Sequence, residues 1–486
     1  MVGINPQEPI KKDIPVIDKE KNKSKDKSNE EVKTEKPQEN NTDKDKNSIT
    51  PSSKSETKAK TSISLGFDNS KPTAPDKNPD KDNRFNGLAR EIFFPLVSKN
   101  SNKTDIVNPL LVSGIKTDSK GLVLTNIPAT PALNFSMIDA PTQAVATLFD
   151  KLSKEFPNVE KNTLYRLAKV ATYVAIDVPL MVASHELGHA GGAKDSCPSC
   201  NPNVQIHNWM SGLTQYNRPE GVSISDKERL FSSVAGMNQA TYNGEEISRR
   251  MHTKGADISD AIQYLVNITN SANYQMKDWI KNSKAGTNDG ATYHKMLEDR
   301  NKGWNQSNLS MLSVGVNLLN TDFWTSLIGS ANYIITGKQI KMPEIKVGNY
   351  NFSLPSLSLI NTYEGPQLNT SIYAHNGGKS TAELKYSTIL TPDNGASMGI
   401  EGRLHNLYIP HTNDSLSVSP IVGVSTSNKE LGFKVGTGIN YRPMNNKYVS
   451  VSADFSYKTN YMPEVYMPNA RNDGFSGILG VNLSLP

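Results

Sequence analysis

The spacing of apolar residues divides the chain into a helical part and an extended part, and the change falls near residue 350. Upstream of it, apolar side chains recur every three to four positions, which is typical of helices packed on a core. Downstream, apolar and polar residues alternate, which is typical of half-buried strands. The helical spacing predicts helices over 141–156, 164–190, 226–252, 258–283 and 289–301, and a buried helical hairpin over 309–335. We expect a loop of about 30 residues between the second and third of these helices.

Three segments near the C-terminus alternate most clearly: 433–442, 448–458 and 475–485. Together with the turn residues that separate the other extended segments, they predict about eight antiparallel strands. Two folds fit this pattern. In a sandwich the apolar face packs on a second sheet, whereas in an outer-membrane barrel it contacts lipid. We favour the barrel, because the small and charged residues of the other face, such as Glu401 and Arg403, suit its lumen.

The N-terminal segment fits neither pattern. Residues 1–66 contain no aromatic residue, cysteine or histidine and are rich in lysine, aspartate, glutamate, asparagine and serine. Such a segment cannot bury enough apolar area to offset the entropy of ordering its backbone. The expected fold class is therefore α+β in three parts: a disordered charged tail over 1–84, a mostly helical domain over 85–345 and an antiparallel β-barrel or sandwich over 346–486.

The charge pattern argues against a nucleic-acid partner. The formal net charge is +5, and the tail mixes both signs of charge, whereas a nucleic-acid-binding arm would be more purely basic. Residues 1–6 lack the apolar region of a signal peptide. Because the C-terminal strands match an outer-membrane pattern, we nevertheless expect the protein in the bacterial cell envelope, outer membrane or periplasm, with membrane contact through the β-domain.

The candidate chemistry lies in residues 185–189, which read His-Glu-Leu-Gly-His and end an apolar stretch with helical spacing. Residues four apart share one face of a helix, so His185 and His189 can bind one zinc ion. Glu186, between them, can then accept a proton from the water that attacks a carbonyl group. The plain alternative is a helix that carries two histidines by chance. The apolar residues behind the pair favour a metal site, because such a site is built into a core.

This motif resembles that of the zincin metallopeptidases and, more loosely, that of the gluzincin branch, in which a glutamate on a later helix is the third zinc ligand. The resemblance implies zinc-dependent hydrolysis of a peptide or protein substrate. In this chain Gln239 stands where the gluzincin glutamate would be. Two other candidates lie on the predicted helix 226–252, and of these we favour Glu246 over Glu245, although both could instead pair with nearby arginines on a solvated face. Tyr242 on the same predicted helix is a candidate hydrogen-bond donor to the oxyanion, and its plain alternative is a residue of the amphipathic helix surface.

The motif also resembles that of the intramembrane site-2 proteases. In that family an aspartate in a segment resembling N-L-L-x-x-x-x-D-G, from a distant membrane helix, completes the zinc site. Residues 317–322 of this chain read Asn-Leu-Leu-Asn-Thr-Asp, which makes Asp322 a further candidate ligand. The spacing is shorter, and Phe323 stands where that family has glycine. This resemblance implies proteolysis within a membrane.

These observations predict a zinc metallopeptidase that is anchored in the envelope by its β-domain. Two alternatives stay open: a non-catalytic envelope protein with a structural or degenerate zinc site, and an intramembrane protease. Cys197 and Cys200 form a single C-x-x-C pair, which fits a short disulfide, two free thiols or, together with His207, a second small metal site.

Overall fold

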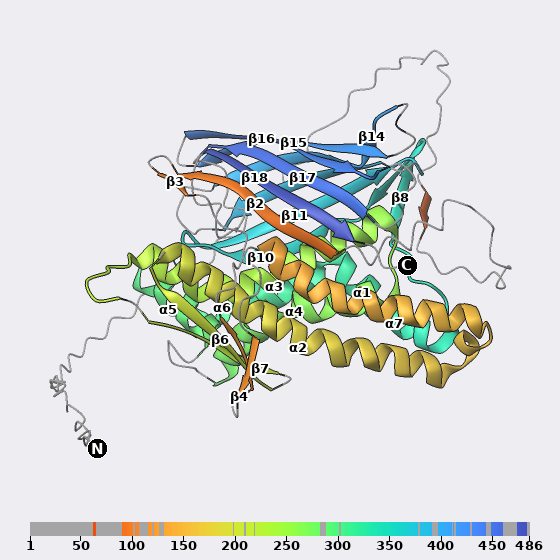
Figure 1. The fold of residues 1–486 in the computed structure, drawn as a ribbon, viewed down its shortest axis with the longest axis horizontal. Helices are drawn as coiled ribbons and strands as arrows, with labels where there is room; N and C mark the ends of the chain where they lie inside the picture. Colours follow the sequence, from red (N-terminus) through yellow and green to blue (C-terminus); the bar gives the residue numbers. More distant parts are fainter. Residues whose placement is uncertain are drawn as a thin grey trace, which may run out of the picture. The chain divides into compact units, whose positions relative to one another are not determined.

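The computed structural model describes residues 62–64, 90–100, 103–105, 115–118, 121–125 and most of 131–483, where the longest gap is 460–473. This part of the chain folds into seven α-helices and two antiparallel sheets (Figure 1). The mixed helical and β character that the sequence predicts is therefore confirmed. Of the expected disordered tail, only Ser62–Ser64 is described, as the short strand β1, and the rest lies outside the described residues.

Most helices lie close to where the apolar period predicts them, but the first begins at Pro131, ten residues before the predicted start at Pro141. The zinc-motif helix is longer than expected, because it continues through Gly191 and Gly192 to Ser196. A β-carbon at Gly192 would lie 2.7 Å from that of Ala235, so this glycine serves the close packing of two helices and does not end one. The helices are α1 (Pro131–Glu155), α2 (Thr163–Ser196), α3 (Asp226–Lys254), α4 (Ile258–Lys281), α5 (Asp289–Asp299), α6 (Gln306–Leu319) and α7 (Thr321–Thr336).

Helix α3 is packed on several sides. Its N-terminus is fixed by a capping box, in which Ser225 and Glu228 satisfy each other's backbone amides. Met237 packs with residues of α5 and α6, while Met251 packs with residues of α4. Both methionines are fully buried, so each stabilises the fold by about 1.5–3 kcal/mol of apolar burial. This packing fixes α3 against α4, α5 and α6.

The larger sheet contains fourteen of the described strands. Its pairs are antiparallel, as the alternation predicts, although the number of strands exceeds the expected eight or so. The pairing runs as a path from β1 to β3, and no described pair joins these two ends, so the described pairing does not close the sheet into the expected barrel. Strand β2 lies inside the predicted helical domain in sequence, yet it pairs with β18 near the C-terminus. The strands are β1 (Ser62–Ser64), β2 (Arg90–Asn100), β3 (Lys103–Asp105), β8 (Glu344–Val347), β9 (Tyr350–Ser353), β10 (Ser356–Asn361), β11 (Pro366–His375), β12 (Thr381–Ile389), β13 (Met398–His405), β14 (Leu407–Tyr408), β15 (Leu416–Ser427), β16 (Glu430–Tyr441), β17 (Val449–Lys458) and β18 (Gly474–Leu483).

One face of this sheet is covered by helix α3. Strand β10 lies directly against that helix, where Asn238 donates to the backbone oxygen of Asn361 at 2.8 Å and accepts from its amide. One turn further along, the hydroxyl of Thr241 donates to the backbone oxygen of Leu359. Figure 1 shows the helices gathered on this side of the sheet.

The smaller sheet corrects one prediction. The segment after α2 was expected to be a loop, but it forms a hairpin whose first strand extends the sheet in the order β4-β5-β6-β7. A disulfide between Cys197 and Cys200 closes the turn from α2 into β6, which confirms the simplest of the three interpretations of this pair. The strands are β4 (Ile115–Asp118), β5 (Gly121–Thr125), β6 (Asn201–Asn208) and β7 (Ser211–Asn217).

Candidate metal centre

The two histidines of the motif lie on the face of α2 that packs against α3. Small residues allow the two helices to approach closely: a β-carbon at Gly188 would lie 2.7 Å from the backbone oxygen of Ala235. Four residues apart on α2, the two imidazoles point the same way, and their Nε2 atoms are 3.2 Å apart. His185 is almost fully buried, whereas the side chain of His189 is 13% exposed.

A third group reaches the same point from α5. Asp289 Oδ2 lies 2.9 Å from His185 Nε2 and 3.1 Å from His189 Nε2. These three side chains form the one group among the described residues that could hold a metal ion. A tetrahedral metal with bonds of about 2.0–2.1 Å separates its ligand atoms by roughly 3.3–3.4 Å. The separations of 2.9 to 3.2 Å are close to that value, so the residues fit a metal ion.

The outer nitrogen of each imidazole has its own hydrogen-bond acceptor. His189 Nδ1 lies 2.9 Å from the backbone oxygen of Ser232, and His185 Nδ1 lies 3.1 Å from Asn270 Oδ1. Because an oxygen of this kind only accepts, each Nδ1 carries a proton, and Nε2 is the nitrogen that binds a metal once the proton it shares with Asp289 is released. The amide of Asn270 is in turn oriented by a hydrogen bond from its nitrogen to Met181 Sδ. Such outer partners fix the tautomer that a metal ligand needs.

Asp289 is positioned by the start of its helix. The preceding residue, Asn288, is the N-cap of α5 and accepts from the backbone amides of Gly290 and Ala291. The amide nitrogen of Asn288 also donates to the backbone oxygen of Tyr274 on α4. This contact ties the first turn of α5 to α4 and places the carboxylate of Asp289 beside the imidazoles.

The two histidines and Asp289 shift one another's pKa values. Burial alone would lower the pKa of His189, but the Asp289 carboxylate outweighs it and raises that pKa to about 9. Burial would likewise raise the pKa of Asp289, yet the neighbouring His189 and His185 hold it well below its usual range. The carboxylate therefore stays ionised, which is the form that binds a cation.

Gly236 of α3 lies directly in front of the two imidazoles. A β-carbon at this position would lie 2.5 Å from His189 Nε2 and 2.6 Å from His185 Nε2. Any side chain here would occupy the space on which the two lone pairs converge. The glycine thus leaves a hollow at the point where a metal would need room.

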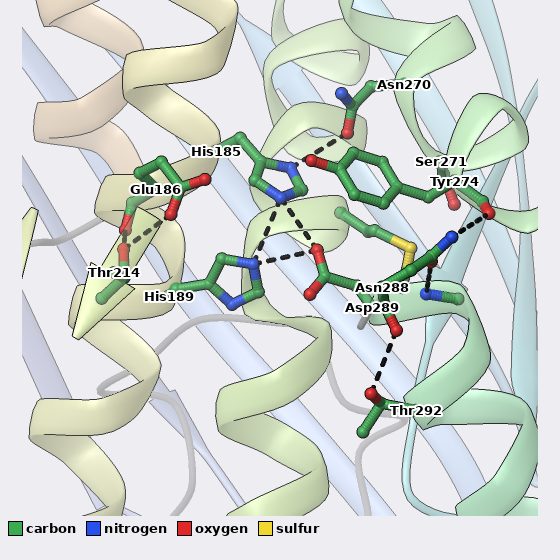
Figure 2. Close-up of polar contacts among 12 residues, drawn as sticks. His185, Glu186, His189, Thr214, Asn270, Ser271, Tyr274, Asn288, Asp289 and Thr292 are labelled. Atoms are coloured by element: carbon green, nitrogen blue, oxygen red, sulfur yellow. Dashed lines mark hydrogen bonds and ion pairs between the residues drawn. The ribbon is translucent and has the colours of Figure 1, made fainter. Parts of the chain in front are cut away.

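Glu186 is held on the other side of the histidines from Asp289, as Figure 2 shows. Its carboxylate is buried, and Oε2 lies 2.8 Å from the hydroxyl of Thr214 on β7. The same hydroxyl lies 2.8 Å from the backbone oxygen of Glu186. Gly212, also on β7, is so close that a β-carbon there would lie 2.5 Å from Glu186 Cγ. Strand β7 therefore covers and orients this carboxylate.

The ring of Tyr274 stacks on His185, with centroids 4.7 Å apart and an angle of 8° between the planes. Burial raises the pKa of this phenol, so the ring stays neutral. The stack fixes the plane of the imidazole and leaves its Nε2 edge free for Asp289.

The other predicted site residues lie elsewhere. Glu245 and Glu246 are nine and ten residues beyond Gly236 on α3, which places them about 14 and 15 Å further along the helix axis. Glu245 accepts from Lys385 of the large sheet, and Glu246 pairs with Arg249. The structure therefore brings neither glutamate to the histidines, and Asp289 occupies the place that we assigned to them.

Three further residues that the sequence analysis singled out also lie away from His185, His189 and Asp289. Gln239 is buried between α1 and α3, where it bonds Asn134 and Asn243. Asp322 pairs with His252 and accepts from Ser248, so it does not complete the site as the site-2 resemblance implied. Tyr242 lies six residues beyond Gly236 on α3, about 9 Å further along the helix axis, and the ring stacked on His185 belongs to Tyr274.

Sequence reasoning missed Asp289, Asn270 and Tyr274. A signal for Asp289 was available, because residues 288–290 read Asn-Asp-Gly, which combines a helix N-cap with the aspartate-glycine pair of the site-2 pattern. Asn270 and Tyr274 lie four residues apart on α4 and carry no motif of their own.

Helix α2 is the one described helix that is long and apolar enough to cross a membrane, over Thr163–Lys194, by length and composition. A third of its most apolar window is buried, and core helices of soluble proteins meet the same test. Its charged Lys169 pairs with Glu160, and its Asp177 accepts from Thr142. The intramembrane interpretation thus stays a prediction.

Comparison with known proteins gives no relative. No family model matches the chain, and no curated protein or solved structure matches it.

Proposed function

We propose that the chain is a metal-dependent peptidase, in which His185, His189 and Asp289 hold a zinc ion and Glu186 is the general base. The observation that carries this proposal is the convergence of two imidazole Nε2 atoms and one carboxylate in front of Gly236. When bound, zinc supplies Lewis acidity, which polarises a carbonyl group and lowers the pKa of water. This donor set also suits iron(II), so the metal content has to be measured.

The residues of the chain have separate tasks in this proposal. The Glu186 carboxylate accepts a proton from the attacking water and passes it to the leaving nitrogen. The Thr214 hydroxyl holds this carboxylate in place at 2.8 Å. Asn270 and the backbone oxygen of Ser232 keep the Nε2 lone pairs of the histidines directed at the metal.

An extended peptide fits the surroundings of Glu186. Strand β7 lies at one end of the described order of the smaller sheet and pairs on one side with β6. Its other edge can add a peptide strand by main-chain hydrogen bonds. Because Gly212 and Thr214 of β7 contact Glu186, a peptide bound there lies next to the proposed base.

A second candidate function is a structural metal site without catalysis. It is favoured by the burial of Glu186, which is 6% exposed and already has a hydrogen-bond partner in Thr214. In that case the metal would fasten α5 to α2 and add to the stability of the fold.

The experiment that separates the two candidates uses Glu186→Gln in the full chain. For a peptidase, hydrolysis of a fluorogenic peptide library should fall by at least about 100-fold, which is within the usual contribution of a general base. Metal content should be unchanged. Glu246→Gln is the matched control, since Glu246 pairs with Arg249 and should affect neither property. Equal hydrolysis by the parent and Glu186→Gln proteins, or none by the parent, would reject the peptidase.

A further inference from the structure

The face of the large sheet that points away from α3 is apolar and exposed. Cross-strand pairing aligns its side chains in rows that run over several strands. One row joins Tyr386, Ile400, Val424 and Phe433 of β12, β13, β15 and β16. A second joins Leu384, Gly402, Val422, Val435 and Tyr457 and extends to β17. The side chains in these rows other than Gly402 are 38% to 61% exposed.

The opposite face of the same strands carries charged groups, and these are covered. Lys385 and Glu401 are cross-strand neighbours on β12 and β13, with side chains each 14% exposed. Lys385 pairs with Glu245 of α3, and Glu401 pairs with Lys434 of β16. Beside them, Glu383 pairs with His405. Each of these charged groups is thus paired inside the protein.

This arrangement is the reverse of the pattern found in a sheet that has one face in water. In an antiparallel sheet with one solvated face, the apolar side chains face the core and the charged ones face the solvent. Here the described residues of β12, β13 and β16 do the opposite, and the exposed apolar side chains continue over β15 and β17 as far as Tyr457. A neighbour without hydrogen-bonding capacity is the environment that makes such a pattern favourable.

The size of the face points to an extended neighbour. Eleven outward side chains are each about half exposed. At about 150 Å² for a fully exposed side chain, their exposed apolar area is roughly 800 Å². The largest apolar patch on a typical soluble monomer is smaller, at about 300–600 Å². Interfaces with proteins are also enriched in arginine. The eleven side chains carry no charge: Leu384, Tyr386, Met398, Ile400, Leu404, Val422, Val424, Leu431, Phe433, Val435 and Tyr457.

We propose that the outer face of β12, β13, β15, β16 and β17 contacts the hydrocarbon of a lipid bilayer. These strands are 8 to 12 residues long, and a strand of about 9–11 residues spans the hydrocarbon layer. Each of the five is paired on both sides, so this face presents no unpaired backbone to lipid. The proposal rests on the sheet alone and is independent of the metal centre.

Single cysteines test this contact in the full-length protein. The two native cysteines form a disulfide, so a cysteine introduced at Val424 or Val435 can be labelled selectively with an environment-sensitive fluorophore. The protein is reconstituted with vesicles of phosphatidylethanolamine and phosphatidylglycerol that contain a lipid with a nitroxide on its acyl chain. Lys295→Cys on α5, a half-exposed position, serves as the control. We expect the nitroxide lipid to quench Val424→Cys and Val435→Cys, and iodide in the water to quench only Lys295→Cys.

Two other outcomes would overturn the proposal. Quenching of Val424→Cys by iodide would show that the face contacts water. Protection of that label from both quenchers would show that a second copy of the chain, or another protein, covers the face.

A charge substitution gives a second, separate test. Val424→Lys combined with Val435→Lys places two ammonium groups on this face and should lower the vesicle partition coefficient, measured by flotation, by roughly 30-fold per lysine. Leu148→Lys with Met311→Lys adds the same charge at helix positions of similar exposure and should float like the parent. Unchanged flotation of the sheet variant, with its circular dichroism spectrum intact, would reject lipid contact.

Discussion

Gly236→Ala is the substitution that tests the geometry of the metal centre most sharply. The added β-carbon would lie 2.5 and 2.6 Å from the two Nε2 atoms, whereas contacts between nonbonded heavy atoms are favourable at about 3.5–4.0 Å. The imidazoles would have to withdraw by about 1 Å. Because the methyl group takes the space between the ligands, metal affinity should fall by at least about 100-fold, the upper end of what altered outer contacts cost.

The effect on stability without metal should be small. Overpacking costs about 1–3 kcal/mol, while replacing glycine by alanine inside a helix gains about 1 kcal/mol. The two terms leave a net loss of about 0–2 kcal/mol in the free energy of unfolding. Gly315→Ala is the matched control: it lies inside α6 with no atom within 4 Å of the added carbon, so it should gain stability and keep full metal affinity.

The assay has two parts, competition for metal against a chromophoric chelator and urea unfolding of the metal-stripped protein. If Gly236→Ala binds metal as tightly as the parent protein, the metal does not occupy the space in front of Gly236, and the assignment is refuted. Loss of metal affinity together with collapse of the stripped fold would show instead that Gly236 is needed for packing.

Three further outcomes follow from contacts near the site. Asn270→Ala removes the acceptor of His185 Nδ1 and should weaken metal binding by about 10- to 100-fold, with Asn270→Asp restoring most of it, as chelator competition would show. Burial raises the pKa of Asp177 from 3.8 to about 7, so the folded state disfavours its charged form, and stability should decline as the pH rises from about 4 to 7. Asp177→Asn should flatten this decline in urea unfolding at several pH values, and an unchanged slope would speak against it. Replacing Cys197 and Cys200 by alanine opens a very short loop and should cost roughly 2 kcal/mol of unfolding free energy, after which a reductant should have no further effect.

The helices were predictable because their apolar periods are long and regular. Their ends were less so: Gly191 and Gly192 have the local character of a helix stop, but the approach of Ala235 from α3 makes small residues necessary within α2. The hairpin of β6 and β7 was missed for a similar reason, since its first strand completes a sheet that begins before α1. Tertiary packing therefore determines both the end of α2 and the formation of the β6–β7 hairpin.

The metal centre was predictable only in its local part. His185 and His189 lie four residues apart on one helix, and this spacing alone brings them together. Asp289 comes from a helix a hundred residues later, and its approach depends on how α5 begins beside α4. We sought the third ligand on α3, which does lie against the histidines, but the residue that faces them there is Gly236.

For the sheet, alternation identifies strands and assigns each side chain to a face. It does not determine which face is covered or which strands are neighbours. The pairing of β2 with β18 joins segments about 380 residues apart, and no local pattern encodes that.

The most direct test of the metal centre is elemental analysis of the purified full-length protein beside Asp289→Ala and Glu246→Ala. We predict one tightly bound metal ion per chain, zinc by the present proposal, which is lost in Asp289→Ala and kept in Glu246→Ala. A parent protein without metal, or an Asp289→Ala variant that retains it, would contradict the site.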